Sequence, residues 1–216
     1  MSTKEINEIM SINFRNFTKE SCIIDDTVVI GKNVTIFPGN VLLGNTIIED
    51  DVTLLPNNCI ISSKISKGAT ILNSVIEESE VGENVKIGPF SHVRPNSKIG
   101  QNARIGNFVE VKNSTIDQNT KVSHLTYVGD ADVGKDVNVG CGVVFVNYNG
   151  KTKSRSKVGD HSFVGSSVNV IAPVTIGEKS FVCAGTTVDK NVEAGAFVIG
   201  RSKMCVKPDR AKKYLK

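Results

Sequence analysis

The chain has 216 residues, 39% of them hydrophobic and 22% charged, a globular composition that excludes a disordered, coiled-coil or collagen-like chain. No apolar run approaches the ~18–20 residues that span a bilayer, and the N-terminus MSTKEINEIM has no secretion signal, so we expect a cytoplasmic protein that does not bind membranes. The net charge of +4 equals the excess in the last ten residues, 5 − 1 = +4, so the body is neutral and offers no basic surface to nucleic acid.

Residues 1–21 precede the regular part of the sequence and are predicted to form a short docking helix. Ser2 and Glu5 fit a capping box, and Ile6 and Met10 share one helical side.

A hexapeptide repeat covers most of residues 24–192. An aliphatic or Phe residue returns every sixth position, with occasional five-residue steps, and Gly often follows it. The fifth position of each hexad is usually small or β-branched. The repeated positions are Ile30, Ile36, Leu43, Ile48, Leu54, Ile65, Ile71, Val81, Ile87, Val93, Ile99, Ile105, Val111, Ile116, Val122, Val128, Val133, Val139, Phe145, Val158, Val164, Val170, Ile176, Val182 and Val188.

This repeat predicts an all-β parallel β-helix over residues 22–200. Strand alternation directs the fifth position and the next aliphatic residue inward, and the frequent Gly suits the corner. Each hexad is then one side of a prism whose coils bury a core only by stacking. Three hexads per coil give about nine coils and a rod of roughly 45 Å.

Two cations are predicted to stack at one edge of this rod. Arg94 and Lys112 hold the same hexad position eighteen residues apart, so they lie on consecutive coils. Cations about 5 Å apart repel one another unless an anion lies beside them, which predicts a phosphate site.

His124 occupies an outward third position within the sequence SHLTY. A solvated surface histidine is one interpretation, and a general base is the other. A base needs a partner that orients it, and the outward Glu110, Tyr127 and Asn138 are the candidates.

The longest break in the repeat is Asn147–Lys157, which contains a Tyr and four cations. It is either a tolerated surface insertion or a loop that recruits an anionic ligand. If the break counts as one enlarged hexad, Asn147, Ser166 and Ala184 continue the edge of Arg94 and Lys112.

Residues 201–216 form a basic tail, interpreted as solvated or as a contact for a phosphorylated ligand. Its last ten residues hold Asp209 and the cations Lys207, Arg210, Lys212, Lys213 and Lys216. The five cysteines have no C-x-x-C pair, which argues against disulfides and zinc and predicts small buried hydrophobes in a reducing compartment.

Residues 87–201 resemble the C-terminal acetyltransferase domain of the bacterial bifunctional N-acetylglucosamine-1-phosphate uridyltransferase/glucosamine-1-phosphate acetyltransferase family. The motifs that carry the resemblance are IGPFSHVRP, IGNFVEVKNSTI, SHLTYVGDADVG, NVGCGVVFVNYNGKTK, VGDHSFVGSSVNVIAPVTIG, AGTTV and IGRS. It implies a left-handed β-helix and a homotrimer that transfers acetyl from acetyl-CoA to the amine of glucosamine 1-phosphate, a precursor of UDP-N-acetylglucosamine and peptidoglycan.

The resemblance also implies a role for individual residues, with no metal required. His124 is the general base. The sugar phosphate is bound by Arg94, Glu110, Lys112, Tyr127, Asn138 and Lys153. Acetyl-CoA is bound by Asn147, Tyr148, Ser166, Ala184 and Arg201.

Departures from the family pattern are small. The chain has NYNG where the family has NYDG, Lys112-Asn113 where it has two lysines, and Cys141 and Cys183 where it has alanines. No nucleotide-binding G-x-G-x-R segment precedes the repeat, so we do not expect uridylyl transfer from this chain.

The implied chemistry is direct transfer, in which neutral His124 accepts the proton of the attacking amine. An acyl-cysteine on Cys141 or Cys183 is disfavoured because neither has a paired base in the sequence. Two alternatives are an N-acetyltransferase of another amino sugar or nucleotide-linked amino sugar and a non-catalytic trimeric scaffold. A third is a zinc hydratase that uses His92, His124 and His161 as ligands. The irregular spacing of these histidines argues against their meeting at one metal ion.

The position of His124 predicts a site shared between subunits. Its hexad lies on another edge than that of Arg94 and Lys112, and about five residues, or roughly 15 Å of strand, separate neighbouring edges. We therefore expect a trimer in which a neighbour brings the two edges together, with the Asn147–Lys157 loop crossing between subunits.

Overall fold

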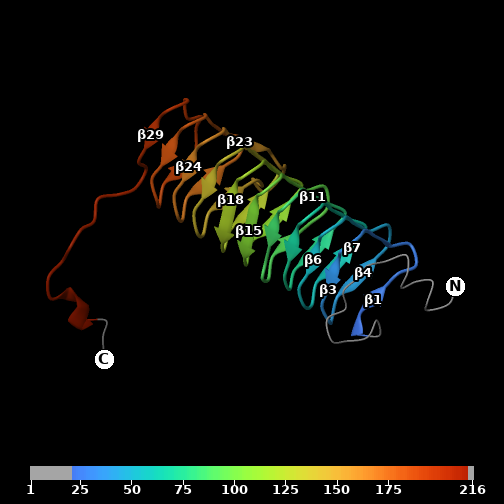
Figure 1. The fold of residues 1–216 in the computed structure, drawn as a ribbon. Coiled ribbons are helices and arrows are strands. Elements are labelled where there is room, and N and C mark those ends of the chain that lie inside the picture. The colour runs from blue at the N-terminus through green and yellow to red at the C-terminus, as the bar shows by residue number, and fades with distance from the viewer. Residues whose placement is uncertain (1–20, 214–216) are drawn as a thin grey trace, which may run out of the picture.

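The computed structural model describes residues 21–213 as a rod of stacked coils with a tail that leaves its C-terminal end (Figure 1). The predicted left-handed parallel β-helix is confirmed, with ten coils rather than nine. The predicted docking helix lies outside the described residues. Among those described, no helix is long and apolar enough to cross a membrane.

Three parallel sheets form the walls, and each coil passes through sheets A, B and C in turn. Sheet A contains β3 (Thr35–Ile36), β6 (Thr53–Leu54), β9 (Thr70–Ile71), β12 (Lys86–Ile87), β15 (Arg104–Asn107), β18 (Lys121–His124), β21 (Asn138–Val139), β24 (Phe163–Val164), β27 (Phe181–Val182) and β29 (Phe197–Val198).

Sheet B contains the first described strand of the rod. Its strands are β1 (Ile23–Ile24), β4 (Val41–Leu43), β7 (Cys59–Ile61), β10 (Val75–Glu77), β13 (His92–Val93), β16 (Glu110–Lys112), β19 (Tyr127–Gly129), β22 (Val144–Val146), β25 (Asn169–Ile171) and β28 (Thr187–Val188).

Sheet C completes each coil. Its strands are β2 (Val29–Ile30), β5 (Ile47–Ile48), β8 (Lys64–Ile65), β11 (Glu80–Val81), β14 (Lys98–Ile99), β17 (Thr115–Ile116), β20 (Ala131–Val133), β23 (Ser156–Val158) and β26 (Thr175–Ile176). A 3₁₀ turn, η2 (Arg210–Lys213), follows in the tail.

From Ile36 onward the predicted aliphatic residues are buried, with one exception: Leu42 is fully buried, whereas Leu43 is only half-buried. Ile30, in the first coil, is only partly buried and packs against the core. Ile60 and Ile76 also belong to the core and were missed. The repeat is weak there because buried polar residues such as Asn58 replace the small inward side chains.

Glycine does not act at the corners in the way the sequence suggested. The left-handed backbone conformation belongs to the fourth position of the hexad, as in Asn84 and Asn102 with φ of 55° and 58°. Gly100, at the second position, is instead required by close approach, because a Cβ there would lie 2.6 Å from the backbone nitrogen of Gln118 on the next coil. The cysteine prediction was also partly wrong, since Cys183 is buried but Cys205 is exposed.

Truncating one inward side chain tests the core. Ile99→Ala opens a cavity in a core that has only neighbouring coils to fill it, so we expect the free energy of unfolding to fall by about 2–5 kcal/mol in denaturant titrations. Lys98→Ala is the matched control, because this outward neighbour makes only an exposed ion pair with Glu80. Equal losses in the two variants would contradict this assignment of the core.

Candidate active site

The predicted site residues gather at two corners of the rod. The A–B corner is the bend between sheets A and B, and the B–C corner is the bend between sheets B and C. Hydrogen bonds between successive turns hold the A–B corner together: Leu125 donates its backbone N–H to Asn107 O, Gly142 to His124 O, Ser167 to Cys141 O, and Gly185 to Ser166 O. His124, Cys141, Ser166 and Ala184 therefore form one column along this corner.

Asn107 orients the imidazole of His124. Its Oδ1 lies 2.8 Å from His124 Nδ1, and β15 and β18 bring the two residues into register. Because a carbonyl oxygen only accepts hydrogen bonds, Nδ1 carries a proton in this contact, so the lone pair of the neutral imidazole is on Nε2. The exposed Nε2 atom is then the position from which His124 can accept a proton.

The predicted orienting partners of His124 do not contact it. Tyr127 Oη lies 3.4 Å from Asn147 Nδ2, and Glu110 binds Arg94. Asn138 is exposed on the wall of sheet A, where its backbone is in register with Lys121 of the neighbouring strand. Asn107 was missed in the sequence. It lies seventeen residues before His124, which is one coil of the repeat, so the repeat could have identified it as the residue below His124.

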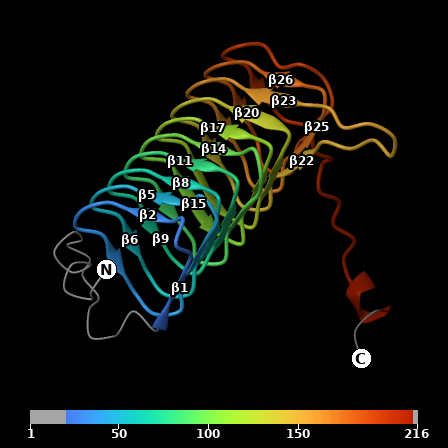
Figure 2. The ribbon, with the colours of Figure 1, turned by 90° about the vertical axis from the view of Figure 1, so that its right-hand side faces the viewer.

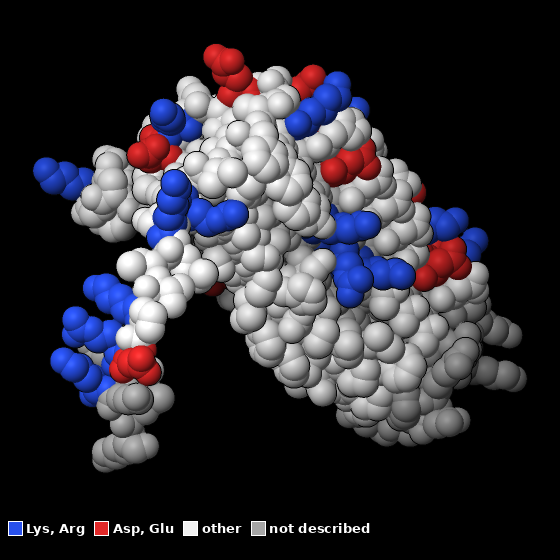
Figure 3. All heavy atoms as spheres, turned by 90° about the vertical axis from the view of Figure 1, so that its left-hand side faces the viewer, with Lys and Arg blue, Asp and Glu red and all other residues white. Residues whose placement is uncertain are grey.

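At the C-terminal end of the same column, Arg201 donates from Nη1 to the backbone oxygen of Ala184 at 2.8 Å. The contact holds the first residue of the tail against the A–B corner. The other cations of the tail lie beyond it, and Figure 3 shows them gathered along the segment that leaves the rod. Arg201, Ala184 and Ser166 thus share one corner with His124.

The cations predicted to stack do so at the B–C corner. Arg94 and Lys112 follow paired strands, and the backbone N–H of Arg94 donates to Val111 O at 2.8 Å. The Arg94 guanidinium binds Glu110 at 2.8 Å, which raises the pKa of Arg94. The charge of Arg94 is therefore balanced by a carboxylate in this chain.

Lys112 has a different neighbour. The ammonium of Lys153 lies beside it, and this contact, followed by partial burial, lowers the pKa of Lys112. Two ammonium groups held together are destabilising without an anion. Lys153 is thus the larger source of repulsion on Lys112, and the predicted repulsion by Arg94 adds to it.

Asp130 is the counter-charge that holds this corner together. Burial raises its pKa, but the amides of Asn113 and Asn147 donate to the carboxylate, and with the nearby lysines they bring the pKa below its ordinary value. Asp130 was missed in the sequence, although Asn113, Asp130 and Asn147 repeat at a spacing of seventeen residues.

The structure corrects the edge predicted for Asn147, Ser166 and Ala184. Asn147 lies at the B–C corner against Asp130, whereas Ser166 and Ala184 lie at the A–B corner. The error came from counting the sequence break as a hexad. The loop adds no side to the prism, because Phe145 pairs directly with Val170 in sheet B.

The loop leaves the B–C corner as a small hairpin that projects from the rod (Figure 2). Tyr148 and Lys153 pair across it, and Tyr148 Oη donates to Gly150 O at 2.7 Å. Arg155 anchors its base through Asn113 O at 2.7 Å, Ala131 O at 3.0 Å and the carboxylate of Asp132. The exposed Tyr148 and Lys153 are thus presented outward on an anchored loop.

The two corners lie at opposite ends of the sheet B wall. Lys112 pairs with Gly129, five residues beyond His124, so about 16 Å of extended strand separates the columns. Within one chain, His124 therefore does not reach a small ligand held by Lys112 and Lys153.

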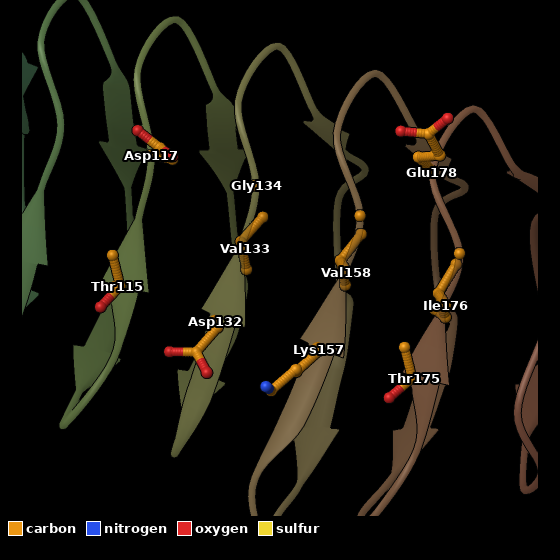
Figure 4. A pocket seen from close by; sticks show the side chains of 12 residues that line it. Thr115, Asp117, Asp132, Val133, Gly134, Lys157, Val158, Thr175, Ile176 and Glu178 are labelled. Carbon is orange, nitrogen blue, oxygen red and sulfur yellow. The ribbon is translucent and has the colours of Figure 1, made fainter. Parts of the chain in front are cut away.

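A groove of about 480 Å³ lies elsewhere, on the outer face of sheet C (Figure 4). Asp132 and Lys157 lie side by side on neighbouring strands there. It contains none of the predicted site residues, so we assign the site from the two corners. The described residues hold no group of three or more His, Cys, Asp or Glu that could bind a metal.

The anchor of the loop predicts a pH dependence. The hydrogen bond from Arg155 lowers the pKa of Asp132, so its stabilisation is present above the ordinary aspartate pKa of about 3.9 and is lost as the pH falls through the lowered value. At pH 7, Asp132→Asn should reduce the Tm by about 1–3 °C, and the difference from the parent should shrink below about pH 4. Asp189→Asn, which changes an exposed carboxylate, is the control; a pH-independent difference for Asp132→Asn would contradict the assignment.

Comparison with known proteins shows which proteins this chain is similar to. The model of the bacterial transferase hexapeptide (six repeats) matches residues 78–113. The bifunctional protein GlmU of Clostridium kluyveri is 44% identical over 201 residues, which is 91% of this chain and 44% of the relative. GlmU of Caldanaerobacter subterraneus is 50% identical over 184 residues, 85% of this chain and 40% of the relative.

Among solved structures, LpxA from Bacteroides fragilis, a UDP-N-acetylglucosamine acyltransferase, shares the fold with a TM-score of 0.61 and 17% identity over 82% of this chain and 68% of that one. The chain spans less than half the length of the curated relatives it matches. Over about nine tenths of its length, the chain is therefore a homologue of part of the bifunctional protein GlmU.

Proposed function

We propose that this chain is an acetyl-CoA-dependent N-acetyltransferase that converts glucosamine 1-phosphate to N-acetylglucosamine 1-phosphate in the cytoplasm. The observation that carries the proposal is the placement of His124. Its Nδ1 is held by Asn107, it shares a corner with Ser166, Ala184 and Arg201, and the neighbouring ammonium groups of Lys112 and Lys153 lie at the other corner.

His124 would act as a general base in a direct transfer. The amine of the acceptor must lose a proton to attack the thioester carbonyl, and Nε2 accepts that proton as the bond from carbon to nitrogen forms. The bond from carbon to sulfur then breaks, and the thiolate leaves. No hydrogen bond in the described part of the chain joins Cys141 or Cys183 to a base, so the proposed route has no acyl-cysteine.

The acceptor phosphate would bind at the B–C corner. A phosphate between Lys112 and Lys153 replaces their repulsion with two charge-assisted hydrogen bonds. Arg94, with Glu110, and Tyr127 border the same position and are suited to hold a sugar. The donor would lie along the A–B corner, where backbone groups of Ser166 and Ala184 face the pantetheine arm and Arg201 faces its phosphates.

A homotrimer would bring the two corners together. One chain holds the proposed base and the lysine pair about 16 Å apart, which is farther than a hexosamine phosphate bridges while its nitrogen lies within ~3 Å of the base. A three-fold neighbour can place its B–C corner, with the loop that carries Tyr148 and Lys153, against the A–B corner of the first chain. Asn138, outward beside that corner, would then face the acceptor.

Removing the proposed base tests the mechanism. We expect His124→Ala to lower kcat for acetyl transfer by roughly 10²–10⁴-fold, because the imidazole is exposed and contributes little to the core. The assay supplies acetyl-CoA and glucosamine 1-phosphate and follows free thiol. Lys86→Ala, outward on the same sheet two coils lower, is the control. Near-parent turnover by folded His124→Ala would remove His124 from the mechanism.

Removing one lysine tests the phosphate site. Lys112→Ala should raise KM for glucosamine 1-phosphate about ten- to a hundredfold and leave KM for acetyl-CoA near the parent value. The same assay with glucosamine and a panel of other amino sugars identifies the acceptor class. Equal activity of the parent on glucosamine and glucosamine 1-phosphate would contradict a phosphate site at this corner.

Mixing the two impaired variants, assayed at a glucosamine 1-phosphate concentration near the parent KM, tests the shared site. Trimers that contain both His124→Ala and Lys112→Ala chains should regain part of the parent activity, because some interfaces combine an intact A–B corner with an intact B–C corner. Mass spectrometry of intact trimers verifies mixing. A fully active monomer in light scattering, or verified mixed trimers without activity, would refute the shared-site proposal.

A further inference from the structure

Asp130 lies at the centre of the B–C corner, between the coil that carries Lys112 and the loop that carries Lys153. Its backbone N–H donates to Lys112 O at 3.0 Å, and its backbone oxygen accepts from the N–H of Ser156, where the loop returns to the rod, at 3.1 Å. Its carboxylate accepts from the side chain of Asn147, where the loop leaves the rod. One residue therefore joins both ends of the loop to the coil of Lys112.

Asn147 passes this constraint on to the cation of the loop. Its backbone oxygen accepts from the N–H of Ser154 at 2.8 Å, and Ser154 directly follows Lys153. Its side-chain amide also lies 3.4 Å from Tyr127 Oη. Because Asn147 is buried, water cannot replace a partner that its side chain loses. A change at Asp130 is thus transmitted through Asn147 to Lys153 and Tyr127.

The hydrogen-bond pattern requires a carboxylate at this position. At the bend between sheets C and A, Asn119 accepts from the asparagine of the coil below and donates to Asp136, so an amide fits in the middle of that column. At the B–C corner, by contrast, Asn113 and Asn147 each donate to one oxygen of Asp130. A neutral amide in the middle would turn its own NH2 group toward one of these donors.

The same carboxylate faces the lysine pair. Asp130 is only 7% exposed, and charges are seldom buried in proteins unless they are paired. The pKa of Lys112 is lowered, first by the contact with Lys153, then by partial burial and by Arg94, and the charge of Asp130 opposes this shift. The charged and titratable groups around the pair are Arg94 with its partner Glu110, Tyr127, Asp130 and Arg155.

We propose that Asp130 is a positioning residue of the acceptor site, which fixes the loop above Lys112 and keeps Lys112 and Lys153 together as a charged pair before a phosphate binds. The proposal rests on the proposed function for the identity of the ligand. The carboxylate repels a phosphate as well as attracting the lysines, so charge alone gives it no net advantage for affinity. Its contribution is preorganisation, because neither ammonium group has to move or gain a proton when the ligand arrives.

The pH dependence of phosphate binding separates this role from a purely structural one. The probe is N-acetylglucosamine 1-phosphate in calorimetry, because it has no amine and its phosphate is a dianion above about pH 7.5. In the parent, affinity should fall as the pH rises and the lysine pair loses a proton. In Asp130→Asn the pair has lost its counter-charge, so this fall should move to lower pH by roughly 0.5–1.5 pH units.

Asp189→Asn is the matched control. It removes one exposed carboxylate that follows β28, four sheet B strands or about 19 Å above Lys112, so its pH profile should follow the parent. A lower Tm of Asp130→Asn with an unchanged pH profile would make Asp130 a structural residue only and would overturn the proposal. A parent protein that binds no N-acetylglucosamine 1-phosphate at any pH would instead refute the acceptor site of the proposed function, and the proposal with it.

A charge swap gives the second readout and keeps the test decisive if Asp130→Asn does not fold. Combining Asp130→Asn with Asn147→Asp retains one carboxylate and one amide in the pair. The new amide can donate to the new carboxylate and still accept from Asn113. A carboxylate then remains beside the lysines, so the fall in affinity should return most of the way to the parent pH. A folded double variant in which the fall stays at the lower pH would overturn the role assigned to the charge.

Discussion

Hydrogen bonds between successive coils are the interaction on which the rest of this structure depends. Each coil donates to and accepts from its neighbours along three sheets, which fixes the rise of each coil at about 4.8 Å and aligns equivalent hexad positions. Any property that repeats in the sequence therefore becomes a continuous column in space. Inward columns form the core, and outward columns form surfaces of a single chemical character.

Because equivalent hexad positions stack from coil to coil, charged side chains at one position lie close to those of the next coil and need opposite charges beside them. On sheet C the outward columns are balanced locally, since Lys64 binds a glutamate of the coil below and Lys98 does the same. At the B–C corner, Asp130 and its two asparagine partners sustain the arrangement, yet Lys112 and Lys153 still lie together. A rigid scaffold tolerates such a pair where binding of an anion repays the repulsion, so this corner is the electrostatic exception on a regular rod.

The same regularity explains why one wall separates the two halves of the candidate site. His124 and the proposed donor residues Ser166 and Ala184 share one column, and the lysine pair occupies another, because an edge of the prism continues unchanged from coil to coil. A straight rod cannot fold one of its edges onto another. In the proposed trimer, a second rod alongside would complete the site, with the loop of Tyr148–Lys153 extending beyond the wall.

The sequence by itself determined the solenoid, the inward residues of its regular part, and the stacking of Arg94 on Lys112, because these follow from a six-residue period alone. The family motifs also singled out His124 and the basic loop. Only the tertiary structure decided that the loop adds no side to the prism, which moves Ser166 and Ala184 to the corner of His124 and leaves Asn147 on the other. It also identified Asn107 as the partner of His124 and Asp130 as the shared partner of Asn113 and Asn147. All of these neighbours are set by which coil stacks on which. A break in the six-residue period hides that register in the sequence, and only the pairing of the strands in the folded chain fixes it.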